Sequence, residues 1–240
     1  MSLAGTAMAD AHPHQDAPDE ATRPARVVLI DDHPIVRKGL LATLAAEDDL
    51  DVIGEASSVS EGYDLLREEK PDLAIVDLSL GDGHGLELIK QVHAHDWGIK
   101  LLVCSMLDEA LYADRVVRAG ASGYLRKDQA ADHVVDAVRT ILAGKVYLSE
   151  SATSRVLSQI SAGDGTRGEA SVEQLSDREL EVFEMIGDGL GSRDIAGRLH
   201  LSIKTVETYR EKIKAKLDLK NGNELTRHAI HYRMRGQDGV

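Results

Sequence analysis

The sequence contains one cysteine, and the lack of a second excludes an intramolecular disulfide. Cys104 lies in an apolar segment at 100–105, so we expect a buried thiol rather than a catalytic one. No apolar run approaches the roughly 18 to 20 residues that a membrane span needs. The N-terminus also lacks the basic and then apolar order of a signal peptide. We therefore predict a soluble, cytoplasmic protein without a membrane partner.

Negative charge predominates overall, but it is distributed unevenly along the chain. The formal net charge of the 240 residues is -13, which alone argues against a nucleic-acid partner. From residue 170 onward, 12 Lys and Arg balance 12 Asp and Glu, so the preceding residues, with 16 against 29, carry the whole excess. Within 200–235, 9 basic residues stand against 4 acidic ones, a local charge of +5. This asymmetry indicates a polyanion-binding segment, although a solvated basic helix face would explain the charge equally well.

The length and the 42% hydrophobic content favour two ordinary domains. Residues 1–25 are polar and aperiodic, and we predict a disordered tail or a cloning remnant there. Strand and helix patterns alternate across 26–147, which predicts an α/β domain with a doubly wound parallel sheet. The expected strands lie near 27–31, 51–56, 73–77, 100–105 and 122–126. The expected helices lie near 35–47, 59–69, 85–94, 108–118 and 129–143.

A linker at 148–170, Gly-rich in its second half, is expected to lead to a second domain at 171–235. The second domain is predicted to be small and all-α, with four helices. Ser176 and Glu179 have the spacing of a capping box at the start of its first helix. The short step between its second and third helices has helix-turn-helix spacing. The four expected helices are 177–187, 192–199, 202–217 and 223–232.

Acidic and cationic side chains follow the apolar strands of the first domain. Asp31 and Asp32 follow the first strand, Asp77 ends the third, Ser105 ends the fourth, and Lys127 follows the fifth. The carboxyl ends of parallel strands meet at one edge, so these groups should share a pocket. Three clustered carboxylates repel one another unless a cation lies among them, and a solvent-open cleft suits Mg²⁺.

The residues of this expected pocket indicate that the protein accepts a phosphoryl group. Asp77 would be the nucleophile, since a carboxylate can accept a phosphoryl group directly. Lys127 and the Ser105 hydroxyl would contact phosphoryl oxygens. Mg²⁺ would be held by Asp32 and Asp77, by Asp31 directly or through water, and by the backbone carbonyl of Ser79.

Several motifs resemble a known family in family order from about residue 26 to residue 232. Ile30-Asp-Asp-His-Pro34, Val76-Asp-Leu-Ser-Leu80, Val103-Cys-Ser-Met106 and Gly120-Ala-Ser-Gly-Tyr-Leu-Arg-Lys127 resemble the receiver domains of two-component response regulators. Leu175-Ser-Asp-Arg-Glu-Leu-Glu-Val-Phe183 and Thr205-Val-Glu-Thr-Tyr-Arg-Glu-Lys-Ile-Lys-Ala-Lys-Leu217 resemble the LuxR-type helix-turn-helix of the NarL/FixJ subfamily. The resemblance implies a flavodoxin-like (βα)5 receiver that is phosphorylated on Asp77 by a sensor histidine kinase with Mg²⁺.

The resemblance also implies that Ser105 and Tyr124 form the switch pair, although the sequence alone favours Tyr124 as a half-buried strand aromatic. The chain departs from the family pattern after Asp77. Gly81 stands where proline is usual, and His84 stands where an acid is common. We therefore expect a more flexible loop between Ser79 and Gly85.

The third helix of the second domain has two distinct faces. Val206, Ile213 and Leu217 fall on one side and should anchor the helix to its neighbours. The resemblance places the other side in the major groove of double-stranded DNA. Glu207, Glu211 and Thr208 would then contact bases, and Lys204, Thr205 and Lys212 would contact phosphates. The alternative is a solvated helix face without a ligand.

Together these patterns predict a response-regulator transcription factor, a switch rather than a turnover enzyme, that forms a homodimer when active. A phosphatase of the haloacid dehalogenase type would need an acid two residues after Asp77, where Ser79 stands. A regulator that works without phosphorylation is a further alternative. The apolar stripe of the last helix, with Leu225, Ala229 and Tyr232, fits either a core or a dimer face. Surface positions without metal are favoured for five histidines: His12, His14, His93, His95 and His133.

Overall fold

The computed structural model describes residues 23–162 and 172–237 of the chain. Most of the expected tail at 1–25 and the Gly-rich part of the expected linker lie outside these ranges. Within them, no helix is long and apolar enough to cross a membrane.

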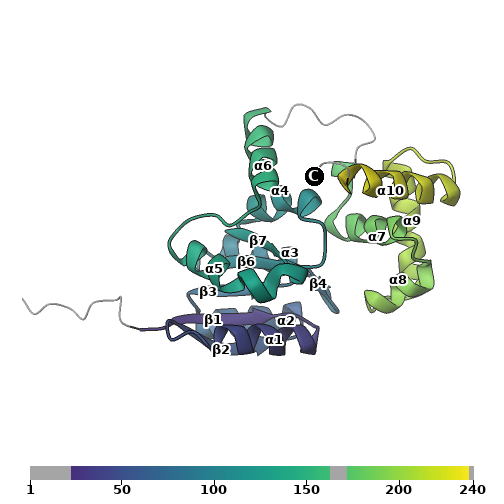
Figure 1. Ribbon diagram of the computed structural model, residues 1–240. Coiled ribbons are helices and arrows are strands. Elements are labelled where there is room, and N and C mark those ends of the chain that lie inside the picture. Colours follow the sequence, from purple (N-terminus) through teal and green to yellow (C-terminus); the bar gives the residue numbers. More distant parts are fainter. Residues whose placement is uncertain (1–22, 163–171, 238–240) are drawn as a thin grey trace, which may run out of the picture.

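A five-stranded parallel sheet forms the centre of the larger part of the molecule (Figure 1). Its strands are β1 (Ala25–Ile30), β2 (Leu50–Ala56), β3 (Leu73–Val76), β6 (Lys100–Ser105) and β7 (Gly123–Arg126). The spatial order is β2-β1-β3-β6-β7, so the chain reverses its direction of addition after β2. In the central register, Ile30 pairs with Val76, and Val76 pairs with Val103. This register brings the ends of β1, β3 and β6 to one edge.

Helices cover both faces of the sheet, as the continuous burial of β1, β3 and β6 requires. The helices are α1 (Pro34–Leu44), α2 (Val59–Glu69), α3 (Gly85–Ala94), α4 (Glu109–Ala119) and α5 (Ala130–Leu142). Val27 and Leu29 pack in one cluster with residues of α1 and α5, whereas Val28 and Ile30 pack in a second cluster with residues of α2, α3 and α4. The doubly wound, flavodoxin-like fold expected from the sequence is confirmed.

The segment after Asp77 differs from the expected flexible loop. Two short strands, β4 (Ser79–Leu80) and β5 (Gly83–His84), pair as an antiparallel hairpin. His84 is buried, and its ring stacks on that of Tyr112. Its Nδ1 also accepts a hydrogen bond from the backbone of Leu86 at the start of α3. The hairpin is therefore held by contacts with residues elsewhere in the chain, which its local sequence does not reveal.

The last four helices form a second, smaller lobe (Figure 1). After α6 (Glu150–Ala162), the lobe contains α7 (Asp177–Gly187), α8 (Ser192–Arg198), α9 (Ile203–Lys216) and α10 (Gly222–Gln237). Short 3-10 turns occur at Lys127–Gln129 and Val172–Gln174. Ser176 and Glu179 form the expected capping box, and Ser202 caps α9. The all-α architecture expected for this part of the chain is confirmed.

The two lobes are in contact. One cluster of buried hydrophobic residues runs from the α2, α3 and α4 side of the sheet into α7, α8 and α9. Polar contacts surround it: Asp177 at the start of α7 binds Lys90 at 2.9 Å and Arg115 at 3.0 Å. Arg115 also donates to the carbonyl of Leu175 at 2.8 Å. The smaller lobe therefore docks through α7, leaving α9 and α10 on its outer side.

Candidate functional site

The structure brings the predicted pocket residues together at the carboxyl edge of the sheet. Lys127 Nζ lies 2.7 Å from Asp77 Oδ2 and 2.7 Å from Asp31 Oδ2. These three side chains are almost fully buried, with relative exposures of 4% or less. Ser105, at the end of β6, is buried as well. Four separate strand ends thus supply two carboxylates, one ammonium and one hydroxyl to a single site.

The electrostatics of the pocket are set by burial and by these short contacts. Burial raises the pKa of Asp77 to about 6; Lys127 opposes this shift and the Asp31 carboxylate adds to it. Burial works against the Lys127 ammonium, but Asp77 and Asp31 outweigh it and raise the pKa of Lys127. The pair is therefore a carboxylate held beside a permanent cation, which is the arrangement that a phosphoryl acceptor needs.

The carboxylates also fit a divalent cation. Ligand atoms of Asp31, Asp32, His33 and Asp77 all lie within 4.8 Å of one another. Oδ1 of Asp77 is buried and receives no hydrogen bond from the described residues, as expected for an oxygen reserved for an external partner. Hard oxygen donors of this kind suit Mg²⁺. His33 was missed by the sequence reasoning, although it directly follows the acid pair; its Nδ1 lies 2.6 Å from Asp32 Oδ1.

The predicted switch pair occupies two neighbouring strands. Ser105 on β6 pairs in register with Arg126, and Tyr124 on β7 pairs with Val103. Tyr124 is fully buried rather than half-buried as its sequence context favoured, and its hydroxyl donates to the carbonyl of Leu107 at 2.7 Å. This bond joins β7 to the turn that precedes α4.

The predicted reading face of α9 is accessible. Its anchoring residues, Val206, Ile213 and Leu217, are buried as expected. The opposite side presents five exposed side chains: Lys204, Glu207, Thr208, Glu211 and Lys212. Thr205 is less available, since its hydroxyl lies 2.7 Å from the Ser202 hydroxyl within the helix cap. Docking of the two lobes leaves this face uncovered.

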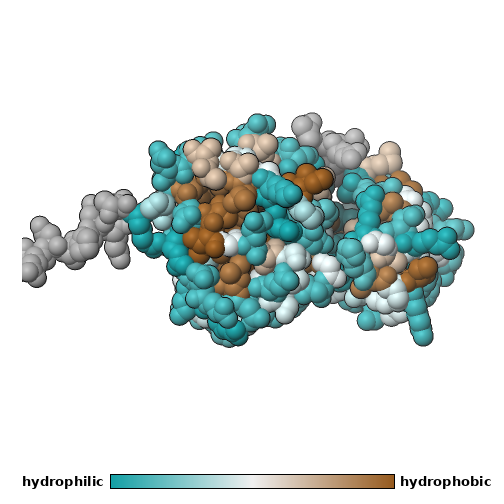
Figure 2. All heavy atoms as spheres, turned by 90° about the horizontal axis from the view of Figure 1, so that it is seen from below, coloured by the Kyte–Doolittle hydropathy of each residue, from teal (hydrophilic) through white to brown (hydrophobic). Residues whose placement is uncertain are grey.

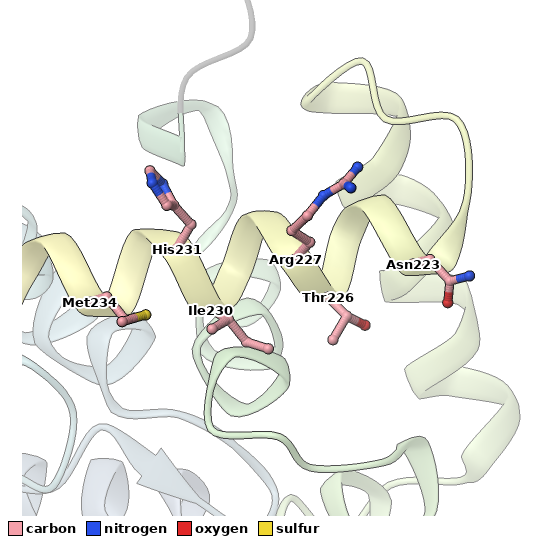
Figure 3. Close-up of a pocket in the computed structure, with 6 residues that line it drawn as sticks. All are labelled: Asn223, Thr226, Arg227, Ile230, His231 and Met234. Carbon is pink, nitrogen blue, oxygen red and sulfur yellow. The ribbon is translucent and has the colours of Figure 1, made fainter.

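The carboxyl-terminal helix, α10, has one side that faces the core and another that lies at the surface. Leu225 and Ala229 are buried, so the stripe predicted from the sequence faces the core of the smaller lobe. A different side of α10 carries a surface pocket of about 400 Å³ (Figure 3). Ile230 and Met234 line it and remain exposed, Met234 at 60%. The other lining residues are Asn223, Thr226, Arg227 and His231. This polar and apolar mixture suits contact with another macromolecule.

Figure 2 shows one face of the molecule, on which hydrophilic side chains surround a patch of hydrophobic ones on the larger lobe. Among residues 23–162 and 172–237, the cluster of Asp31, Asp32, His33 and Asp77 is the one group of three or more such side chains with close ligand atoms. That His93, His95 and His133 are surface residues without metal stays a prediction. His12 and His14 lie outside the described residues.

Family models match both parts of the chain. The response regulator receiver domain matches residues 27–139, and the luxR family of bacterial regulatory proteins matches residues 173–229. The oxygen regulatory protein NreC of Staphylococcus haemolyticus is 34% identical over 209 residues, which cover 85% of this chain and 96% of that protein.

Solved structures agree with the family models. A structure of the RcsB response regulator of Salmonella typhimurium is 26% identical, covers 88% of this chain and 98% of that one, and has a TM-score of 0.59. RcsB from Salmonella enterica serovar Typhimurium, bound to promoter rprA with the phosphomimetic BeF3-, is 26% identical with a TM-score of 0.56 and covers 86% and 98%. A LuxR-family two-component response regulator from Aurantimonas sp. SI85-9A1 is 32% identical with a TM-score of 0.52 and covers 56% and 96%.

Proposed function

The chain belongs to the two-component response regulators of the NarL/FixJ subfamily and is a transcription factor with a receiver domain and a LuxR-type DNA-binding domain, and we propose that Asp77 is its phosphoryl acceptor. The observation that carries the proposal is the contact of Asp77 with Lys127 at 2.7 Å inside an acidic cluster. A structural ion pair alone would not need further buried carboxylates with an unpaired oxygen.

The residues have separate roles in this proposal. Asp77 forms the bond to phosphorus while the bond to the leaving group of the donor breaks. Lys127 binds an equatorial phosphoryl oxygen, and the Ser105 hydroxyl donates to another. Asp31, Asp32, Asp77 and the carbonyl of Ser79 would hold Mg²⁺, with His33 beside them. When bound there, Mg²⁺ would offset negative charge on the phosphoryl oxygens. The protein supports its own phosphorylation and slow dephosphorylation, without acting on a separate substrate.

Phosphorylation then biases an equilibrium between two arrangements. When the Ser105 hydroxyl engages the phosphoryl group, the buried Tyr124 ring and the Leu107 carbonyl that it binds are coupled to the change. Leu107 precedes α4, and α4 contacts the smaller lobe through Arg115. These contacts support a path from the pocket to the DNA-binding domain.

The partners follow from the two domains. We assign the receiver to 26–147, the linker to 148–170 and the DNA-binding domain to 171–235. A sensor histidine kinase donates the phosphoryl group, and α9 reads double-stranded DNA through Glu207, Thr208 and Glu211, with Lys204, Thr205 and Lys212 on phosphates. The exposed side of α10 supports a homodimer on DNA. In one solved structure, two RcsB dimers are bound to two parallel DNAs. Because its proposed partner is DNA, we propose that this protein works in the cytoplasm.

Intact-mass measurement after incubation with acetyl phosphate tests the proposal. The parent protein should gain one phosphoryl group in the presence of Mg²⁺, and Asp77→Asn should gain none. Glu68→Gln, on the exposed outer side of α2, is a matched control and should behave like the parent. A parent that gains no adduct from acetyl phosphate or from a kinase contradicts the proposal. Rapid accumulation of free phosphate would instead favour a phosphatase.

A further inference from the structure

The hairpin β4–β5 is tied to the start of α2. Asp82, at its turn, accepts hydrogen bonds from the backbone N–H groups of Val59 at 2.7 Å and Ser60 at 3.1 Å. At its base, Gly85 donates a backbone hydrogen bond to the carbonyl of Leu78 at 2.8 Å. One end of the hairpin is therefore fixed by the receiver itself.

The smaller lobe holds the other side of the hairpin. The Ser79 hydroxyl donates to Oε1 of Glu181, a fully buried side chain of α7. Arg178 lies 2.6 Å from the second oxygen, Oε2, of Glu181. Both oxygens of this carboxylate are thus engaged, one with each domain. A hydrogen bond to a buried carboxylate is stronger than one between neutral groups, so this contact restricts Ser79.

The restrained hairpin lies against the acidic pocket. A β-carbon placed on Gly81 would be 3.8 Å from Oδ2 of Asp32 and 3.2 Å from the His200 ring of the smaller lobe. The Gly81 turn is therefore adjacent to a carboxylate of the pocket on one side and to the DNA-binding domain on the other. Movement of the smaller lobe must change what surrounds this turn.

We infer that Glu181 is a positioning residue for the receiver pocket, acting through the Ser79 side chain on the Ser79 carbonyl. The inference rests on the proposed function, because it takes that carbonyl as a metal ligand. It goes further, because a residue of the DNA-binding domain would then help to position a ligand of the metal in the receiver. Metal binding and docking of the smaller lobe then favour each other, and thermodynamic linkage makes the coupling reciprocal.

Mn²⁺ binding to the full-length chain, followed by electron paramagnetic resonance of the free ion, tests the inference without phosphorylation. Glu181→Ala should weaken Mn²⁺ binding about fivefold, a typical size for such a coupling. Glu181→Gln should lose less, since its amide oxygen can still accept from Ser79. Glu68→Gln makes the same chemical change on an exposed side chain and should keep the parent affinity.

Ser79→Ala tests the same bond from the receiver side, leaving α7 and the backbone carbonyl in place. It should weaken Mn²⁺ binding as Glu181→Ala does. The double variant should bind Mn²⁺ no more weakly than either single variant. Additive losses would contradict a shared pathway. Circular dichroism reports whether each variant keeps its helices; if Glu181→Ala unfolds the smaller lobe, Ser79→Ala decides the question.

The reciprocal effect provides a second measurement. Mg²⁺ should slow amide hydrogen exchange in α7 of the parent, but not in Ser79→Ala. Parent-like or tighter Mn²⁺ affinity in both Ser79→Ala and Glu181→Ala overturns the inference, even if Asp77 accepts phosphate normally. A parent that binds no Mn²⁺ and accepts no phosphoryl group overturns the proposed function along with it.

Discussion

Lys127 offsets the charge of two carboxylates that lie almost out of contact with water. Replacing it with Met would keep much of its length but leave Asp77 and Asp31 without a cation. We expect Lys127→Met to lower the free energy of unfolding by about 3 kcal/mol, as loss of one partner does for buried pairs. Added Mg²⁺ should restore part of this loss, while phosphoryl uptake stays low.

Urea unfolding with and without Mg²⁺ measures these effects. Arg126→Met is a suitable control, because Arg126 is adjacent in sequence but pairs with Asp128 on the surface. Arg126→Met should change the free energy of unfolding by no more than about 0.5 kcal/mol. Equal stabilities for the two variants without Mg²⁺ would show that Lys127 does not offset the buried charge.

Gly85 allows α3 to begin directly beside the proposed acceptor. A β-carbon at this position would lie 2.0 Å from the carbonyl oxygen of Asp77, and backbone atoms cannot move away as a flexible side chain can. Gly85→Ala should therefore displace Asp77, reduce phosphorylation by acetyl phosphate and lower stability by about 1 to 3 kcal/mol. Gly39→Ala, on α1 with open space around it, should be neutral or slightly stabilising. Intact-mass kinetics and thermal unfolding compare the two variants.

The sequence was informative about residues whose position follows from local structure. Asp77 and Lys127 follow apolar strands, and parallel strands carry such residues to one edge, so their meeting could be predicted. Glu181 could not be identified in this way. It reads as a polar position of an amphipathic helix, and its burial depends on a hydroxyl 102 positions earlier in the chain. The contact exists only once two domains have folded and docked.

The α9 helix carries both signs of charge on its exposed face, and each sign has a different expected effect on DNA binding. Lys204→Ala should weaken binding to all DNA sequences and reduce the slope of log K against log salt by about 1. Glu211→Ala should instead strengthen binding to unrelated DNA, because a like charge near phosphate is removed. Its contact with Lys214 at 2.9 Å is exposed and contributes little to stability.

Fluorescence anisotropy with a cognate and a scrambled duplex, over a range of salt concentrations, separates these two effects. The ratio of the two affinities should fall in Glu211→Ala and stay nearly constant in Lys204→Ala. Lys38→Ala, on α1 of the receiver, is a control for loss of positive charge elsewhere. If Lys204→Ala and Lys38→Ala have the same DNA affinity and the same salt dependence, α9 does not contact DNA phosphates in the proposed way.

At the scale of elements, the strength of the periodic signal decided what could be predicted. The five strands and the helices of both lobes were expected within a few residues of their observed bounds, because burial imposes periods on them. The β4–β5 hairpin was not expected. Its strands have two residues each, too few to show any alternation, and its order depends on Asp82, His84 and the contact with α7.

The docked arrangement of the whole molecule leaves the reading face of α9 exposed and buries α7 instead. Because α9 is uncovered, we expect regulation to act through the position of the DNA-binding domain rather than through a cover over α9. The buried surface of α7 includes three carboxylates: Glu179, Glu181 and Glu184. Glu179 binds Lys216, and Glu181 binds Ser79 and Arg178. Among the described residues, the ion pair of Glu184 is a longer contact of 3.7 Å with Arg233, so docking should depend on the protonation of Glu184.

Burial raises the pKa of Glu184 to about 8. Arg233 on α10 opposes this shift, and Asp108 of the receiver adds to it. Tyr112 of α4 lies close to the same carboxyl group. When the lobes separate, this carboxyl meets water and returns toward its usual value of 4.5. The docked form therefore binds more protons between these values, and docking weakens as pH rises toward 8. Between pH 6.5 and 8 the loss should reach at most about 1.4 kcal/mol per pH unit.

Hydrogen exchange in α4 and α7 at pH 6.5 and 8 measures this loss when the parent is compared with Glu184→Gln at each pH. The glutamine is neutral throughout, so the ratio between the two proteins removes the pH dependence of exchange itself. His84 lies at the same interface, where burial lowers its pKa, but it is present in both proteins, so its contribution also cancels in this ratio. Protection of the parent should fall relative to the variant as pH rises. A constant ratio would mean that Glu184 reaches water in the docked form and that the lobes are held together without regard to its charge.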